Sequence, residues 1–305
     1  MASLLVTGSI GLDTVETPLG KVEDQLGGSA TYFSLAGCLL NPIRLVGAVG
    51  EDFPDRYRSL LSDRHIDVLG LEVRKGSKTF RWHGRYSPDM NDRTTVNVAL
   101  NVLGERGPKI PGPFKDSAYV FLANNDPQLQ MELLNQLSGP RLVVCDTMDL
   151  WINHHRENLL KVLGRVDGVV LNDGEARTLT GEYNLIAAAM AVGKLGPKFV
   201  IVKKGEHGSL LYGQGRLFLL PAFPIQKVVD PTGAGDSFAG GFMGYLASVD
   251  RSDFAAQAQA LVYGTVAASF TVESFSLDAL AAADRASLDR RRSDFEMMIG
   301  RNLGA

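Results

Sequence analysis

Short apolar runs alternate with longer segments of helical spacing along most of the chain. The short runs predict buried strands over residues 3–7, 43–49, 119–123, 141–145, 168–171 and 199–203. The longer segments predict helices over residues 29–40, 129–137, 151–163, 183–195, 238–249 and 254–272, and a terminal helix that starts at 275–280. Strands that alternate with helices favour an α/β fold with a mostly parallel central sheet.

One region departs from this alternation and predicts a separate small sheet. Its first strand should cover residues 79–86, and a second strand over 94–100 follows a turn. A period of two places on one face the aromatic side chains Phe80, Trp82 and Tyr86, and on the other Thr79, Arg81, His83 and Arg85. We expect this sheet to be inserted at about residues 14–26 and 71–100. Its aromatic face could pack the sheet's own core, form a dimer contact or stack on a base, in that order of preference.

Polar residues follow several of the predicted strands. Asp13 lies shortly after the first strand, and Asn124, Asp146 and Asn172 follow later ones. Because the carboxyl ends of parallel strands meet at one edge of a sheet, these side chains should converge there. Each of them alone could be a turn or cap residue. Their repetition favours a ligand site at this edge.

A glycine turn between a strand and a helix is the most specific pattern in the chain. Residues 223–229 predict a strand, residues 230–236 read Asp-Pro-Thr-Gly-Ala-Gly-Asp, and an apolar helix follows. Gly233 and Gly235 permit a tight turn and let an anion approach the backbone closely. The unpaired N–H groups and the dipole at the helix N-terminus would hold that anion.

Asp236 would lie beside this anion site, in the first turn of the helix. A carboxylate repels an anion, so the arrangement is unsuited to simple anion binding. It is suited to chemistry in which Asp236 removes a proton from a hydroxyl group that then attacks a bound phosphate. The alternative is a structural helix cap with a glycine turn, which would not specify a run of seven residues.

The run from Asp230 to Asp236 resembles the C-terminal signature of the ribokinase-like (PfkB) carbohydrate kinase family. The resemblance covers nearly the whole chain and implies a ribokinase-like three-layer α/β/α sandwich with a small β-sheet lid. It implies Asp236 as general base, with backbone N–H groups of Gly233, Ala234 and Gly235 stabilising the transferred phosphoryl group. It also implies ATP and Mg²⁺ as cofactors and leaves a monovalent cation open.

Motifs near the N-terminus match the same family in part. Asp13 matches the place of an Asp that binds substrate hydroxyl groups, and Gly27 and Gly28 match a glycine pair before the first helix. The family usually has an Asn four positions after the second glycine, whereas this chain has Tyr32. The resemblance therefore implies substrate contacts from Asp13, Gly27 and Gly28, and Tyr32 in the place of the usual Asn.

Asn172 and Glu175 match the family's Asn-x-x-Glu motif, which lies near the metal and the phosphates. Side chains three residues apart can share one face of a helix, and amide and carboxylate oxygens suit Mg²⁺. An N-cap Asn with a first-turn Glu would give the same letters without any metal. The resemblance adds Thr232 and Gly205, together with Asn172, as neighbours of the nucleotide.

These motifs imply transfer of the γ-phosphoryl group of ATP to a hydroxymethyl group of a small sugar-like substrate. A nucleoside kinase of the adenosine type is the alternative, and the aromatic residues point towards it. A non-catalytic ligand-binding regulator on the same fold is disfavoured, because the residues for base and metal are present. The chain has neither a P-loop motif nor a complete Gly-x-Gly-x-x-Gly motif, since Phe238 stands at the third glycine position. Lys203 and Lys204 could touch phosphate or could be solvated.

Length and charge narrow the remaining choices. The 305 residues fit one ribokinase-like α/β domain, residues 1–305, that includes the inserted lid. A net charge of −3 gives no reason to expect nucleic acid or an anionic membrane as a partner. Two cysteines and the absence of a long apolar run predict a cytoplasmic protein. The partners expected are the small-molecule substrate, ATP and, through the lid, a second copy of the chain.

Overall fold

The large sheet has nine strands in the order β13-β12-β11-β10-β9-β8-β1-β4-β5 in the computed structural model, which describes residues 1–301. Seven strands are parallel: β1 (Leu4–Thr7), β4 (Ile43–Gly50), β5 (Ile66–Arg74), β8 (Tyr119–Leu122), β9 (Leu142–Asp146), β10 (Gly168–Asn172) and β11 (Phe199–Lys203). At one edge β12 (Ser209–Gly213) and β13 (Arg216–Leu220) are antiparallel. The predicted α/β class with a mostly parallel sheet is confirmed.

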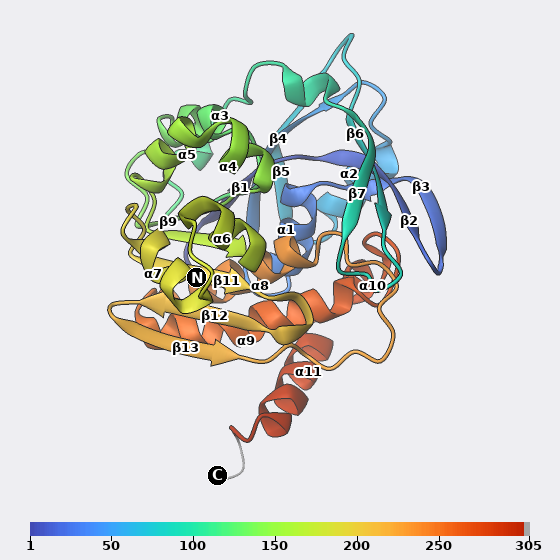
Figure 1. The fold of residues 1–305 in the computed structure, drawn as a ribbon. Helices are drawn as coiled ribbons and strands as arrows, with labels where there is room; N and C mark the ends of the chain where they lie inside the picture. Colours follow the sequence, from blue (N-terminus) through green and yellow to red (C-terminus); the bar gives the residue numbers. More distant parts are fainter. Residues whose placement is uncertain (302–305) are drawn as a thin grey trace.

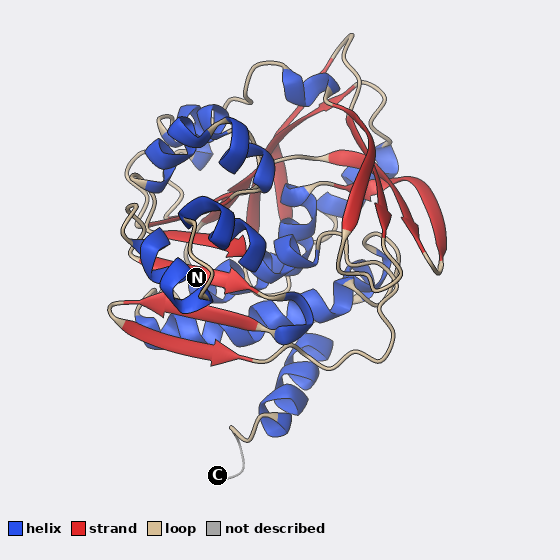
Figure 2. Cartoon of the chain, viewed as in Figure 1, coloured by secondary structure: helices blue, strands red, loops and turns tan. Residues whose placement is uncertain are grey.

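Helices cover both faces of this sheet, so the molecule has three layers (Figure 1, Figure 2). Side chains alternate along each strand, and Leu4 and Val6 pack in one core while Leu5 packs in the other. The first core is closed by α1 (Ser29–Gly37), α2 (Asp55–Ser62), α8 (Ala234–Val249), α9 (Phe254–Thr271), α10 (Asp278–Ala282) and α11 (Arg285–Met298). The second is closed by α3 (Pro127–Leu134), α4 (Asp149–His154), α5 (Arg156–Leu163), α6 (Asp173–Thr180) and α7 (Leu185–Gly193).

A separate sheet of four strands lies at one side of the molecule, at the right in Figure 1. Its order is β3-β2-β6-β7, from β2 (Gly11–Thr17), β3 (Gly20–Gly27), β6 (Phe80–Tyr86) and β7 (Arg93–Ala99). The expected small sheet is therefore present, with β2 and β6 parallel and the other pairs antiparallel. The expected insertion began too early, because residues 71–74 complete β5 in the large sheet. That one domain spans residues 1–305 stays a prediction.

One face of β6 is held by charged pairs. The imidazole Nε2 of His83 lies 2.9 Å from Glu16 on β2, and the Arg85 guanidinium donates to the same carboxylate at 2.6 Å. The Arg81 guanidinium bonds to Asp24 and, at 3.2 Å, to Asp52. The predicted polar face is thus a network that joins strands of the small sheet, through His83 and Glu16, and ties β6 to Asp52 after β4.

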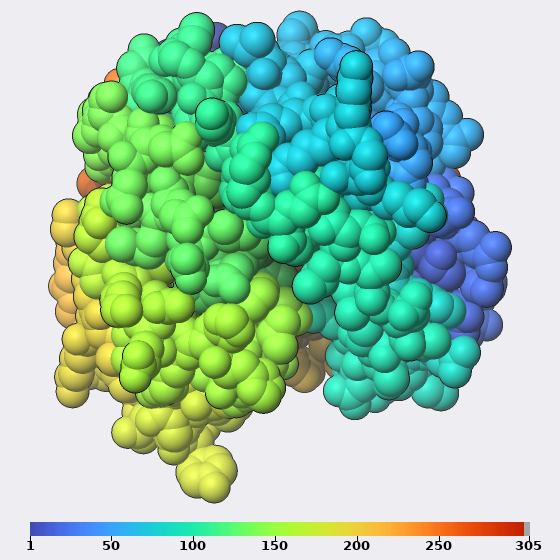
Figure 3. Space-filling view, turned by 90° about the horizontal axis from the view of Figure 1, so that it is seen from above, coloured from blue at the N-terminus to red at the C-terminus, as the bar shows by residue number. Residues whose placement is uncertain are grey.

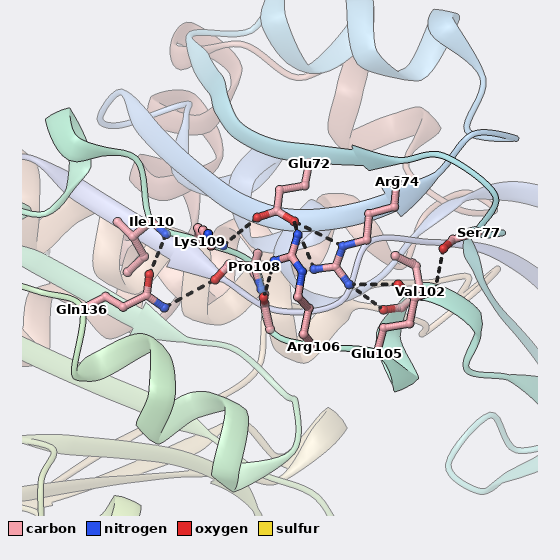
Figure 4. Close-up of polar contacts among 11 residues, drawn as sticks. Glu72, Arg74, Ser77, Val102, Glu105, Arg106, Pro108, Lys109, Ile110 and Gln136 are labelled. Atoms are coloured by element: carbon pink, nitrogen blue, oxygen red, sulfur yellow. Dashed lines mark hydrogen bonds and ion pairs between the residues drawn. The ribbon is translucent and has the colours of Figure 1, made fainter.

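A charged network ties the segment after the small sheet back to the large sheet (Figure 4). The carboxylate of Glu72 on β5 accepts hydrogen bonds from Arg74 at 3.1 Å, from Arg106 at 3.1 Å and from the N–H of Lys109 at 2.7 Å. The Arg74 guanidinium also reaches Glu105 at 3.3 Å. The returning chain is therefore fixed where β7 leads towards two short 3₁₀ turns, Asn101–Gly104 and Gly112–Phe114.

Two predicted elements differ from the structure. Residues 223–229 are an irregular segment with bends at Gln226 and Val229, not a strand, since Pro221 and Pro224 have no N–H to donate to a sheet. The helix expected over 151–163 is divided into α4 and α5 because the backbone of His155 leaves the helical region, with φ −129° and ψ 31°. The functional turn is therefore entered from a loop.

Two features of the structure bear on the expected cytoplasmic location. Within residues 1–301, no helix has the length and apolarity to cross a membrane. Cys38 and Cys145 are both free thiols. A cytoplasmic location stays a prediction.

Candidate active site

The carboxyl edge of the large sheet gathers the residues that the sequence singled out. From β1, the next strands along the chain, β4 and β5, are added on one side of the sheet, and the later strands β8 to β11 are added on the other side. The order in which strands are added therefore reverses beside β1. Ligands of open α/β sheets bind at such a reversal, outside the carboxyl ends of the strands. In the space-filling view a hollow lies between the teal surface of the small sheet and the yellow-green surface that follows β10 (Figure 3).

The side chain of Asp230 holds the glycine turn in place. It is fully buried, and its two carboxylate oxygens accept hydrogen bonds from the N–H of Thr232 at 2.9 Å and from the N–H of Ser276 at 3.1 Å. The Ser276 hydroxyl donates in turn to the carbonyl of Leu26 at 2.8 Å, next to the glycine pair. One buried carboxylate thus joins the turn, the segment before α10 and the end of β3.

Gly233 is required at the start of α8 for two reasons. Its φ of +75° lies in the left-handed region, and it occupies the N-cap position without any side-chain cap. A Cβ there would lie 2.3 Å from the ring of Tyr32. The turn therefore rests on the face of an aromatic ring.

The first turn of α8 leaves backbone donors free. Ala234 donates its N–H to the carbonyl of Pro231 at 3.2 Å, and Ser237 donates to Gly233 at 2.8 Å. Apart from the carboxylate of Asp236 itself, Gly235 and Asp236 have no acceptor for their N–H groups among the described residues. These two donors, together with the helix dipole, make the N-terminus of this 16-residue helix suited to an anion.

Asp236 lies in the first turn of α8, as the sequence predicted, and is half-buried. Desolvation raises its pKa to about 7, and the negative charge of Asp146 adds to the rise, while the positive charges of Lys203 and Arg93 oppose it. A carboxyl group whose pKa lies near neutrality can accept a proton during a reaction and release it afterwards.

Asp13 lies on β2, where the pairing with β3 shifts register, and is 6% exposed. Its Oδ1 has no hydrogen-bond partner within the described part of the chain. Its pKa is raised to about 7, mainly by burial; the N–H of Gly28 opposes the rise, and the charges of Asp230 and Asp236 contribute to it. A buried carboxylate oxygen without a partner is costly, so this atom is available to a ligand hydroxyl group.

The glycine pair makes room for this carboxylate and for the chain itself. A Cβ on Gly27 would lie 1.9 Å from Oδ2 of Asp13, and one on Gly28 would lie 2.5 Å from the carbonyl oxygen of Ser9. Gly28 also has a φ of +95° as the N-cap of α1. Both glycines are therefore needed for close approach at this edge.

Tyr32 was expected to contact substrate, and its observed contact is with the turn. The side chain is 2% exposed, and its ring packs on Gly233. Its role as a substrate contact stays a prediction. Sequence analysis had no signal for the contact between Tyr32 and Gly233, because the two residues are far apart in the chain.

Asn172 and Glu175 form a capping box at the start of α6. The Asn172 side chain accepts from the N–H of Glu175 at 2.8 Å, and Oε2 of Glu175 accepts from the N–H of Asn172 at 2.7 Å. The structural alternative, an N-cap Asn with a first-turn Glu, is therefore observed. Its hydrogen bonds occupy one of the two carboxylate oxygens of Glu175. Burial raises the pKa of Glu175 to about 7, and Lys203 opposes this rise.

Two of the three expected nucleotide neighbours, Thr232 and Gly205, lie on different elements. The Thr232 hydroxyl donates to the Tyr86 hydroxyl of the small sheet at 3.1 Å. Gly205 is exposed in the turn Gly205–His207 after β11, with φ +54° and open space around its Cα. Thr232 thus belongs to the glycine turn and Gly205 to the turn after β11, and their contacts with a nucleotide stay predictions.

Three more charged groups lie at this edge, of which the sequence pointed to Asp146 as a strand-end residue and to Lys203 as a possible phosphate contact, but not to Arg93. Lys203 ends β11, with its Nζ 3.9 Å from Oδ2 of Asp146 at the end of β9. Arg93 begins β7 on the small sheet, and its guanidinium lies 5.9 Å from the ring centre of Trp82. The strand-end position was a signal for Asp146 and Lys203. Arg93 had none, because it stood in a predicted turn.

Comparisons with known proteins show the family of the chain and support its fold. The model of the pfkB family of carbohydrate kinases matches residues 2–282. A cytidine kinase of Thermococcus kodakarensis is 32% identical over 250 residues, which cover 80% of this chain and 88% of that protein. A nucleoside kinase of Methanocaldococcus jannaschii is 27% identical over 231 residues, or 75% of this chain and 72% of that protein. The solved structure of an Arabidopsis thaliana ribokinase with ribose and ATP has a TM-score of 0.77 at 21% identity and covers 95% of this chain and 98% of that one.

The match across most of the chain makes the protein a kinase, that is, a phosphotransferase with an alcohol group as acceptor. It belongs to the pfkB family of carbohydrate kinases.

Proposed function

We propose that the protein transfers the γ-phosphoryl group of ATP to the hydroxymethyl group of a nucleoside or a small sugar. The observation that carries this proposal is the position of Asp236, a carboxyl group with a pKa of about 7, beside the free N–H groups that begin α8. A base next to an anion site is what phosphorylation of an alcohol needs.

In this mechanism Asp236 accepts the proton of the substrate hydroxyl as its oxygen attacks the γ-phosphorus. The bond from that phosphorus to the ADP oxygen breaks, and ADP leaves with the electron pair. The N–H groups of Gly235 and Asp236 stabilise negative charge on the phosphoryl oxygens during transfer. Gly233 and Ala234 hold the backbone in the conformation that aims these donors.

Mg²⁺ bound with the nucleotide would supply charge neutralisation for the phosphates. The donor set fits such an ion. Glu175 keeps one carboxylate oxygen outside the capping box, and hard oxygen ligands with bound waters are what Mg²⁺ prefers. We propose that Glu175 and Asn172 hold the ion. Within residues 1–301 no group of three or more acidic, His or Cys side chains is arranged to hold a metal ion, so waters and phosphate would complete its coordination.

Asp13 is proposed to bind a hydroxyl group of the substrate through its unpartnered Oδ1. A nucleoside is the first candidate, because the relative that is 32% identical is named a cytidine kinase and the M. jannaschii relative is named a nucleoside kinase. A free sugar is the second candidate, since the matching family is described as carbohydrate kinases. Tyr32 and Gly28 would shape the same substrate site, and Thr232 and Gly205 the nucleotide side.

The small sheet would act as the lid that excludes water from the phosphoryl group. We also propose that β7, an edge strand with Val96 45% and Val98 49% exposed, pairs two copies of the chain. Size-exclusion chromatography with light scattering tests this point. A monomer at all concentrations, with unchanged elution after Val98→Lys, would contradict it.

The central test is ATP consumption with a panel of nucleosides, sugars and sugar phosphates. We expect turnover with a nucleoside, and a loss of at least about a hundredfold in kcat for Asp236→Asn, the scale of general-base catalysis. The matched control is Asp63→Asn, at an exposed carboxylate that ends α2. Undiminished turnover in Asp236→Asn would remove the mechanism, and turnover with sugars alone would favour the second candidate. Replacing potassium with sodium or choline tests the monovalent cation.

A further inference from the structure

Lys203 reaches the same space as the free N–H groups of α8. It is the last residue of β11, and its side chain is 19% exposed. An added Cβ on Gly235 would lie 2.7 Å from Lys203 Nζ, so this ammonium group occupies the space that any other residue at 235 would fill. Glycine at position 235 therefore leaves space for the Lys203 ammonium group as well as permitting the tight turn.

The ammonium group makes no hydrogen bond to any residue in the described range 1–301. Its nearest anionic atom is Oδ2 of Asp146, at 3.9 Å, which is an ion pair without a hydrogen bond. A largely buried ammonium has three donors that need acceptors. Lys203 thus presents unused donors towards the anion site.

The surrounding charges keep Lys203 protonated. Burial works against the charge, but the carboxylates of Asp146, Glu175 and Asp236 outweigh it and raise the pKa of Lys203 above its usual value. Arg93 acts in the opposite direction. The site therefore holds a fixed positive charge beside its base before any ligand arrives.

We propose that Lys203 is a further catalytic residue, whose ammonium group binds the γ-phosphoryl group of ATP during its transfer. The proposal rests on the kinase function proposed above. As the substrate oxygen bonds to phosphorus and the bond to ADP breaks, the proton of the attacking hydroxyl passes to Asp236. Lys203 keeps its own protons throughout and donates hydrogen bonds to the phosphoryl oxygens, together with the N–H groups of Gly235 and Asp236.

The alternative role for Lys203 is a counter-ion that only neutralises Asp146 and Glu175. In that case its loss would destabilise the fold and weaken all nucleotides alike. A phosphoryl ligand predicts a selective effect, because ADP lacks the γ-phosphoryl group that Lys203 would contact. Comparing a non-hydrolysable ATP analogue with ADP therefore separates the two roles.

The test uses Lys203→Met in the full chain, with Lys204→Met as the matched control on the next residue. Calorimetry with Mg²⁺ should show the affinity for the ATP analogue falling about tenfold in Lys203→Met, with ADP affinity changed less than about threefold. We expect kcat to fall about a hundredfold, as when one donor of an oxyanion site is removed. Lys204→Met should leave all three values within about twofold of the unchanged protein.

Equal losses for the analogue and ADP, or a kcat within about threefold of the unchanged protein, would overturn the proposal. Should Lys203→Met fail to fold, Gly235→Ala provides a second variant that keeps every charge. Its methyl group would displace the flexible end of Lys203, so the preference for the analogue over ADP should fall, and an unchanged preference would contradict the role. The binding measurements need no turnover. A protein that phosphorylates no nucleoside or sugar would therefore contradict the proposed function, whereas the binding measurements would still decide whether Lys203 holds the γ-phosphoryl group.

Discussion

The hydroxyl of Thr232 in the glycine turn donates a hydrogen bond of 3.1 Å to the phenol of Tyr86 in the small sheet. Thr232 is held by Asp230, and Tyr86 is 9% exposed at the end of β6. This bond therefore couples the position of the small sheet to the turn that begins α8. The proposed closure of the small sheet over a ligand would therefore act on the N–H donors through this pair of side chains.

Removing the Tyr86 hydroxyl should weaken this link. We expect Tyr86→Phe to lower kcat/KM about two- to tenfold, the effect of losing one neutral hydrogen bond. Steady-state kinetics with ATP and the accepted substrate measure it. Tyr212→Phe is the control, because the Tyr212 hydroxyl makes no hydrogen bond to any described residue. Equal kinetics for both variants would show that the link has no role in turnover.

The activity should depend on pH through Asp236. The base must be ionised, and desolvation raises its pKa to about 7. We therefore expect kcat/KM to fall as pH drops below about 7, approaching a tenfold loss per pH unit. The residual activity of Asp236→Asn should lack this dependence. A profile that stays flat down to pH 5 would mean that no group with this pKa acts as the base in the free enzyme.

The same raised pKa predicts that stability declines as pH rises from about 4 to about 7. In this window the unfolded chain has lost the Asp236 proton while the folded chain keeps it, so folding takes up a proton. Above about pH 7 Asp236 is ionised in both the folded and the unfolded chain, so its contribution to the free energy of unfolding no longer changes with pH. Asp236→Asn should therefore be more stable than the unchanged protein at pH 8, on the order of 1 kcal/mol or more, with no difference near pH 4.

Urea denaturation at both pH values measures this effect. Asp63→Asn, at an exposed position, should follow the unchanged protein at each pH. A variant at Asp236 that loses stability at pH 8 would contradict the prediction, because it would mean that the ionised carboxylate stabilises the fold.

The contact between Tyr32 and Gly233 can be tested with a pair of glycines. Both glycines have a left-handed backbone, with φ +75° at Gly233 and φ +70° at Gly215. A Cβ added to Gly233 would meet the Tyr32 ring, whereas a Cβ added to Gly215 would meet no atom within 4 Å. Alanine costs about 1–2 kcal/mol at either position for the left-handed backbone. Gly233→Ala should lose about 1–3 kcal/mol more, because the methyl group collides with the ring. Thermal unfolding compares them, and equal losses would show that the ring yields freely.

The proposed metal site predicts a change in the magnesium requirement. Removing Mg²⁺ with a chelator should abolish turnover, and Glu175→Gln should raise the Mg²⁺ concentration needed for half-maximal rate about tenfold or more. The Gln side chain can still accept the N–H of Asn172, so the capping box and the melting temperature should be preserved. An unchanged Mg²⁺ requirement would assign Glu175 a purely structural role.

Local patterns predicted the fold class, since alternating apolar runs and helices leave little choice but a parallel sheet with helices on both faces. They failed where a long-range contact or a backbone restriction decides the outcome. The strand expected at 223–229 is an irregular segment because Pro221 and Pro224 have no N–H to pair in a sheet. The edge strand β13 was not predicted, because Leu217 and Leu219 point outwards and its pairing depends on β12.

The sequence by itself determined the glycine turn, its place at the start of α8 and the carboxylate of Asp236 in the first helical turn. These follow from local rules: glycine where the backbone is left-handed, and N–H groups without partners at a helix start. Only the tertiary structure decided that Tyr32 supports the turn, that Tyr86 joins it to the small sheet and that Lys203 lies against Gly235. These residues are 201, 146 and 32 positions from their partners in the chain, so only the packing of β6, α1 and β11 around α8 brings them together.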